Sequence, residues 1–229
     1  MIVPSMNYEE TAIEIFSDHV EVFNLYKTKL NIQAAMAKRT NHYYWVETLR
    51  VKTKRNNEWR ITVNYTPIKR EIAIYLKVHD QAGLVAYCVT LLQDEVALVV
   101  KYTPHFFRRY NERMNLGLTK PEEILKHFFK NNSAVIPSCN EEEMSDGGRL
   151  AFFSFNNGIG LGRFYPEQLT IQMRTYIAGH ILNKGQQTQV DFLRKEEEEL
   201  GYYKKTAFVE TAKKSLANHA KAYENKASS

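Results

Sequence analysis

Apolar residues recur at two different periods along the chain, and each period predicts a different kind of element. From about Asp18 to Lys38 they follow a helical stripe that includes Phe23 and Ala34, as expected for a helix with one apolar side. Asp18 with Glu21 resembles a capping box, so we expect this helix to begin at residue 18. The residues before it favour neither a helix nor a strand.

The period changes to two after this helix, which predicts β-strands. The expected strands cover residues 43–51, 59–65, 72–78, 84–92 and 96–102. Alternation in the first two predicts a hairpin with one buried face, whereas the last two are apolar on both sides and suit central strands. Together they predict an antiparallel meander of five strands.

Two helices and a second group of strands are expected after the meander. The first helix follows Thr103, with Pro104 at its first helical position, and is expected to stop at Gly117, since these residue types favour those positions. A capping box at Thr119 begins the second helix. Residues 131–148 are polar and predict a loop. The later strands are expected over residues 150–155, 159–165 and 169–176, with a hairpin turn at 156–158.

The whole pattern predicts an α+β protein, in which an antiparallel β meander is followed by two helices, a small antiparallel sheet and a long C-terminal helix. We expect a globular domain over residues 1–183 and a helical extension over residues 184–229. The glycine-rich run Gly158–Gly162 lies between two strands. This context favours a bulge or a close backbone approach over a dinucleotide-binding loop, which would join a strand to a helix.

Composition narrows the class of protein only a little. The chain of 229 residues has a formal net charge of +5 and a pI near 9.0, which permits a nucleic acid or another polyanion as partner without demanding one. Cys88 and Cys139 are far apart and belong to no Cys/His cluster, so neither a metal nor another cofactor is expected. A signal-peptide pattern and an apolar run of membrane-spanning length are not seen, which favours the cytoplasm and excludes a membrane partner.

The first of the two helices after the meander carries the best candidate for function. His105, Arg109 and Arg113 recur at every fourth position, with Arg108 beside them, so they form a ridge on the side away from the apolar residues. One interpretation is that this ridge binds a phosphate and that His105 moves a proton near neutral pH. The other is a solvated helix face, in which Glu112 pairs with a neighbouring arginine.

The same residues carry a resemblance to a known family. The run His105-x3-Arg109-x3-Arg113, the helix start Leu118–Ile124 and the strand ending Met173–Ile177 resemble motifs of small bacterial domains in the RelE-like toxin superfamily. The resemblance covers about residues 100–180. The run from Thr103 to Arg113 also resembles one in uncharacterised proteins of the Bacteroidetes type, which implies no activity.

Members of the RelE-like superfamily are often ribonucleases that act on messenger RNA, so the resemblance implies metal-independent RNA cleavage. Under it, His105 would be an acid or base, and the three arginines 109, 113 and 174 would stabilise the phosphate. Tyr176 or Tyr110 would stack on a base, and Arg108 and Arg163 would add nucleic-acid contacts. A simpler interpretation of Arg174 and Tyr176 is an exposed strand face at a sheet edge.

Two functions therefore remain open from the sequence, and whether the chain is an enzyme is not decided. In the first, the protein binds RNA or another polyanion and cleaves RNA at a site of the RelE-like type. In the second, it is a non-catalytic accessory protein whose terminal helices, including the C-terminal one, bind a protein partner.

Overall fold

The computed structural model describes residues 1–3, 5–40, 45–65, 70–92, 96–132, 138–186, 188 and 191. Its strands form one sheet in the order β1-β2-β3-β4-β5-β9-β8-β7-β6. These strands are β1 (Trp45–Lys52), β2 (Glu58–Tyr65), β3 (Arg70–Asp80), β4 (Gly83–Leu92), β5 (Val96–Tyr102), β6 (Ser138–Glu143), β7 (Arg149–Phe155), β8 (Gly158–Tyr165) and β9 (Thr170–Ala178). The main helices are α1 (Tyr8–Thr40), α2 (Pro104–Arg113) and α3 (Pro121–Asn131), with short 3-10 turns η1 (Pro166–Gln168) and η2 (Gly179–Ile181).

The predicted five-strand meander is confirmed, because β1 to β5 pair in sequence order and all antiparallel. The prediction of a separate small sheet is wrong. β7, β8 and β9 join the meander through β9, which pairs parallel with β5 over Val99–Tyr102 and Thr170–Met173. Pairing between segments so far apart in sequence leaves no trace in the local period of apolar residues, so the sequence pattern could not reveal it.

The predicted start of the first helix is also wrong. α1 begins at Tyr8, where Asn7 and Glu10 form a reciprocal capping box: each side chain accepts a hydrogen bond from the other's backbone N–H, both at 2.9 Å. Asp18 therefore lies inside the helix and is fully buried. It looked like a cap because an acidic residue three positions before a glutamate fits the capping pattern whatever its surroundings.

Two further local predictions are corrected. The expected loop over residues 131–148 contains β6, an edge strand paired with β7, and its acidic composition hid the pairing. The second helix after the meander has Lys120 as its N-cap, without a side-chain hydrogen bond, so the capping box at Thr119 does not form. The start of α3 is instead set by Pro121 at the first helical position, where its missing N–H has no cost.

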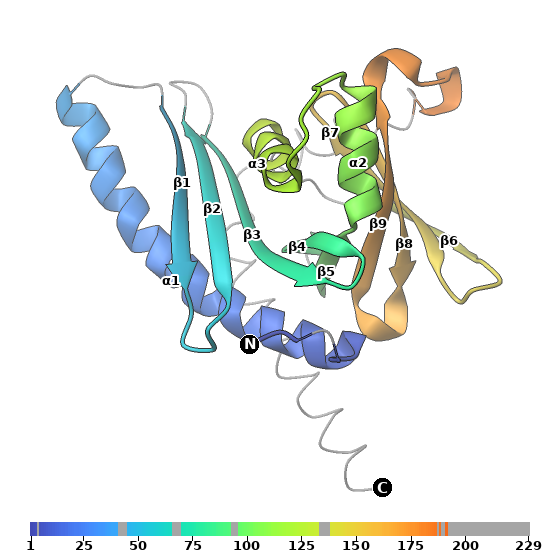
Figure 1. Ribbon diagram of the computed structural model, residues 1–229, viewed down its shortest axis with the longest axis horizontal. Helices are drawn as coiled ribbons and strands as arrows, with labels where there is room; N and C mark the ends of the chain where they lie inside the picture. Colours follow the sequence, from blue (N-terminus) through green and yellow to red (C-terminus); the bar gives the residue numbers. More distant parts are fainter. Residues whose placement is uncertain are drawn as a thin grey trace, which may run out of the picture.

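Helices cover both faces of the sheet, with α1 on one side and α2 and α3 on the other (Figure 1). Each side has its own apolar cluster. Phe106 and Phe128 are central on the α2 and α3 side, whereas Phe16 and Trp59 are central on the α1 side. The hairpin of β1 and β2 was expected to bury one face, but Thr62 is also buried, because α3 contacts β2 from the other side.

A β-bulge interrupts the pairing of β8 with β9, as the glycine run predicted. Leu161 pairs with Thr175 and Gly162 with Met173, so Arg174 has no partner on β8. A Cβ on Gly162 would lie 2.6 Å from the carbonyl oxygen of Gln172, so the close backbone approach is confirmed as well. Bulges redirect side chains and are common beside functional sites.

The predicted C-terminal helix from Gln186 to Tyr223 lies almost entirely outside the described residues, and it stays a prediction. Where the structure is described, we find no helix with the length and apolar content that crossing a membrane requires.

Candidate functional site

The start of α2 is fixed against β9 by one side chain. Thr103 is the N-cap of α2: its hydroxyl oxygen accepts a hydrogen bond from the backbone N–H of Phe106 at 3.2 Å. The same hydroxyl donates to the carbonyl oxygen of Met173 on β9 at 2.9 Å. The predicted cap is therefore confirmed, and it holds the positive end of the helix dipole at the point where β5 ends.

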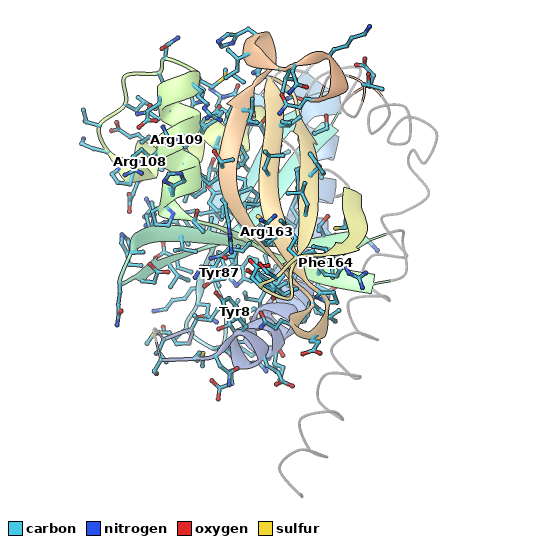
Figure 2. The ribbon with its side chains drawn as sticks, turned by 90° about the vertical axis from the view of Figure 1, so that its right-hand side faces the viewer. Tyr8, Tyr87, Arg108, Arg109, Arg163 and Phe164 are labelled. Atoms are coloured by element: carbon cyan, nitrogen blue, oxygen red, sulfur yellow. The ribbon has the colours of Figure 1, made fainter. Side chains whose placement is uncertain are left out.

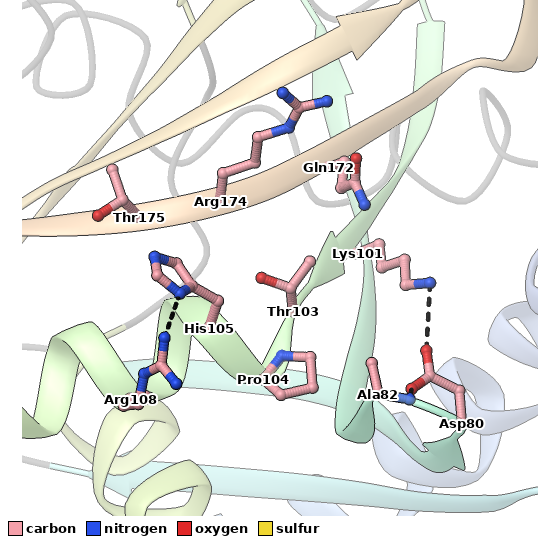
Figure 3. A pocket seen from close by; sticks show the side chains of 10 residues that line it. All are labelled: Asp80, Ala82, Lys101, Thr103, Pro104, His105, Arg108, Gln172, Arg174 and Thr175. Atoms are coloured by element: carbon pink, nitrogen blue, oxygen red, sulfur yellow. Dashed lines mark hydrogen bonds and ion pairs between the residues drawn. The ribbon is translucent and has the colours of Figure 1, made fainter.

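An open cleft of about 700 Å³ lies at this junction (Figure 3). Three parts of the chain line it: the end of β5 with the first turn of α2, the outward side of β9, and the turn between β3 and β4. The lining residues are Asp80, Ala82, Lys101, Thr103, Pro104, His105, Arg108, Gln172, Arg174 and Thr175. The cleft therefore lies at the carboxyl end of β5 and beside the middle of β9.

His105 and Arg108 contact each other at the mouth of the cleft. Nη2 of Arg108 lies 2.7 Å from Nδ1 of His105, and both side chains are exposed. An arginine can only donate, so this contact is a hydrogen bond in the tautomer that carries its proton on Nε2 and leaves Nδ1 as the acceptor. In this arrangement His105 presents an N–H donor. Arg108, whose Nε also lies 3.9 Å from a carboxylate oxygen of Glu112, keeps N–H groups of its two terminal nitrogens for a ligand.

The bulge brings Arg174 to the outward side of β9, where it lines the cleft. It places Arg174 and Thr175 on the same side of β9, between the buried Met173 and Tyr176 (Figure 3). The Arg174 side chain is 47% exposed, and its Nη2 donates to the hydroxyl of Tyr165 at 2.8 Å. That hydrogen bond and the Asp146 carboxylate, 3.8 Å from the same nitrogen, leave the N–H groups of Nε and Nη1 available to an anion.

Lys101 and Asp80 form an ion pair at the other end of the cleft. Their charged atoms are 3.4 Å apart, and the Lys101 side chain is only 16% exposed. The Lys101 ammonium also lies 5.9 Å from the ring centroids of Tyr8 and Tyr87. Among the lining residues, Lys101, Arg108 and Arg174 are positive and Asp80 is negative, and the carboxylates of Glu112 and Asp146 lie 3.9 Å from Arg108 and 3.8 Å from Arg174.

The other predicted charged residues lie outside the cleft. Arg109 pairs with Glu112, at 2.9 Å on the helix surface. Arg113 donates to the backbone carbonyl oxygen of Tyr176. Arg163 lies on the strands that face the viewer in Figure 2, away from α2. The structure therefore brings together His105, Arg108 and Arg174, and not the ridge of every fourth residue.

The two tyrosines predicted to stack on a base are both fully buried. The Tyr110 hydroxyl lies 2.9 Å from Nδ1 of His127, and burial raises the pKa of Tyr110 to about 12. The Tyr176 hydroxyl is directed at the sulfur of Met114, 3.6 Å away, and burial raises its pKa well above the ordinary value. Stacking on a base requires an exposed ring, so neither is placed for that contact.

Several lining residues were not predicted from the sequence. Lys101 had a signal, because it is a charged residue at the end of an otherwise apolar strand. Gln172, Thr175 and Asp80 had none, because their place in the cleft depends on the β5–β9 pairing and on the bulge. In the part of the chain that the structure describes, we find no group of three His, Cys, Asp or Glu side chains that could hold a metal ion.

No protein-family model, curated protein or solved structure matches this chain. The resemblance to the RelE-like superfamily therefore stays a prediction, and the chemistry of the cleft carries the functional argument.

Proposed function

We propose that this protein binds RNA, with the phosphate backbone held in the cleft between α2 and β9. The observation that carries the proposal is the convergence of Arg108, Arg174 and Lys101, from three different elements, on one open surface. Guanidinium groups bind phosphate oxygens through several parallel hydrogen bonds. The N-terminal end of α2 adds a favourable dipole at the same place.

The first prediction concerns the two arginines of the cleft. We expect Arg174→Ala and Arg108→Ala each to weaken the binding of a labelled single-stranded RNA about tenfold at low salt, because each removes charge-assisted hydrogen bonds to phosphate. Fluorescence anisotropy over a salt series measures this effect. The binding of the unmodified protein should also fall steeply as salt rises, since phosphate contacts release counterions.

Lys120→Ala is the matched control for these variants. Lys120 is 75% exposed, pairs with Glu123 and lies outside the cleft, so its removal changes the net charge equally. If the control weakens RNA binding as much as Arg174→Ala does, the attraction is general and the cleft is not the site. RNA left unbound at low salt would support the accessory-protein alternative.

RNA cleavage is a second candidate function, and the position of His105 at the cleft favours it. Cleavage by attack of the 2′-hydroxyl needs a proton acceptor and a proton donor beside the phosphate. While Nδ1 accepts from Arg108 at 2.7 Å, that nitrogen cannot take a proton. A phosphate that draws Arg108 to itself would free Nδ1 to take the proton of the 2′-hydroxyl, and the imidazolium so formed would give a proton to the departing 5′-oxygen.

The second prediction separates binding from cleavage. If the protein cleaves RNA, His105→Ala should abolish product formation in a gel assay, because His105 is the only imidazole among the described residues that line the cleft. Binding should persist, since Arg108 and Arg174 remain. The free energy of unfolding should change by less than about 0.5 kcal/mol, because the side chain is exposed. Equal cleavage by the variant would remove His105 from the mechanism.

A further inference from the structure

A second pair of charged contacts lies beside the cleft, on the outward side of β8 and β9. The carboxylate of Asp146 reaches two arginines with the same oxygen, Oδ2. That oxygen is 3.6 Å from Nε of Arg163 and 3.8 Å from Nη2 of Arg174. Arg174 lines the cleft, whereas Arg163 does not, so Asp146 connects the cleft to a cation one strand further away.

The turn that carries Asp146 is held closely against these strands. It joins β6 to β7, and Oδ1 of Asp146 accepts the backbone N–H of Gly148 at 3.1 Å. A Cβ on Gly148 would lie 3.1 Å from the Tyr165 ring and 3.4 Å from Cδ of Arg163. Glycine therefore lets the turn approach the strands, with the second carboxylate oxygen directed at the two arginines.

The carboxylate satisfies these arginines poorly. Both distances exceed the 2.7–2.9 Å or so of a charge-assisted hydrogen bond, and Nε of Arg163 is buried with no hydrogen-bond partner among the described residues. The Asp146 side chain is 42% exposed, so water weakens its attraction to both cations. A phosphate offers more acceptor oxygens than one carboxylate oxygen, and it could bond both guanidinium groups at once.

The register of the sheet places Arg163 and Arg174 within reach of a ligand that is bound in the cleft. Arg163 pairs with Gln172 on β9, and Gln172 pairs in turn with Lys101 on β5. Neighbouring strands are about 4.8 Å apart. Lys101, Gln172 and Arg163 therefore form a row that leads from the cleft across the outward side of the sheet.

We propose that Arg163 and Arg174 form a second phosphate subsite, which the Asp146 carboxylate occupies when no ligand is bound. The ligand is then an oligonucleotide with at least two phosphates, and its binding displaces Asp146. This inference rests on the proposed RNA binding in the cleft. It adds that the ligand must be long enough to reach both phosphate subsites.

The test compares one long ligand with one short ligand. We expect Arg163→Gln to weaken the binding of a single-stranded RNA of ten nucleotides about fivefold. The slope of log affinity against log salt should become shallower by about 0.7, the value for one phosphate contact on a single strand. The affinity for a nucleoside monophosphate should stay unchanged, since Arg163 lies outside the cleft.

Asp146→Asn should have the opposite effect. It should strengthen the binding of the ten-nucleotide RNA about threefold to fivefold, because it removes the competing charge but keeps the size of the side chain. In the Arg163→Gln background the gain should be clearly smaller, which a double-mutant cycle measures. The matched controls are Glu123→Gln and Lys120→Ala. Glu123 lies on α3, Lys120 is the residue before that helix, and their side chains form an ion pair.

The outcomes separate the two proposals. If RNA binding depends on Arg174 but Arg163→Gln behaves like Lys120→Ala, the second subsite is wrong and the cleft remains. An equal gain from Asp146→Asn and Glu123→Gln would also overturn the subsite. If neither the unmodified protein nor Asp146→Asn binds RNA at low salt, both proposals fail. Circular dichroism confirms that each variant is folded.

Discussion

Replacing Asp18 by alanine should lower the free energy of unfolding by about 3–5 kcal/mol, one of the two largest effects that we expect. The carboxylate is fully buried, and its Oδ2 accepts hydrogen bonds from Thr53 at 3.0 Å, Asn57 at 2.6 Å and Trp59 at 3.0 Å. Alanine would leave the Thr53 hydroxyl and the Trp59 N–H buried without this acceptor, and the Asn57 amide would keep only its bond to Glu14 at 3.2 Å. Each buried group left unsatisfied costs about 1–3 kcal/mol.

Glu21→Ala is the control for this variant. Glu21 lies almost one turn further along α1 and is paired only loosely, accepting from the backbone N–H of Lys54 at 3.4 Å on the surface. Its loss should cost less than about 1 kcal/mol. Urea unfolding followed by fluorescence measures both variants. If Asp18→Ala costs only the 1 kcal/mol or so that is typical of a lost helix cap, the network around Asp18 is not what joins α1 to the β1–β2 hairpin.

The case of Asp18 illustrates what local patterns could and could not predict. The apolar period placed the strands of the meander and the two following helices well, because each of these elements has its own stripe or alternation. The Asp18–Glu21 pair fitted a capping pattern, but the capping residues are Asn7 and Glu10. Whether an aspartate caps a helix or lies buried between elements depends on its tertiary partners, and a local pattern does not contain them.

The candidate site was predicted only in part, because some of its residues come together through tertiary contacts that a local pattern does not contain. His105 and Arg108 are three residues apart near the start of α2, about one helical turn, so their helix and its cap already place them together. Arg174 and Tyr176 are two apart and should share a strand face, but only Arg174 is exposed. The bulge adds one residue between Met173 and Tyr176, which moves Tyr176 into the core.

Arg113 is a charged residue whose structural role follows from the topology of the sheet. β5 ends at Tyr102, so β9 continues beyond Met173 without a strand on that side. Carbonyl groups on this side of β9 need other donors. The Thr103 hydroxyl donates to the carbonyl of Met173, and Arg113 at the far end of α2 donates to that of Tyr176. Helix α2 thus takes the place of a neighbouring strand, with its two ends bonded to β9.

Gly158→Ala is the other variant with a large expected effect on stability. A Cβ at this position would meet the backbone carbonyl oxygen of Ile177, and it would lie 2.7 Å from the hydroxyl oxygen of Tyr176. A flexible side chain could move aside, but a backbone carbonyl of a central strand cannot move without shifting β9. We expect the free energy of unfolding to fall by about 3 kcal/mol, or the melting temperature by about 6–12 °C.

Gly185→Ala is the control, because there a new Cβ would meet nothing closer than 3.6 Å, and its melting temperature should stay within about 2 °C. The strand that Gly158 touches is also the one that presents Arg174 to the cleft. We therefore expect Gly158→Ala, assayed well below its melting temperature, to weaken RNA binding as well. A variant that melts like the unmodified protein would show that β8 and β9 have room for a methyl group. The close approach would then no longer explain why glycine begins β8.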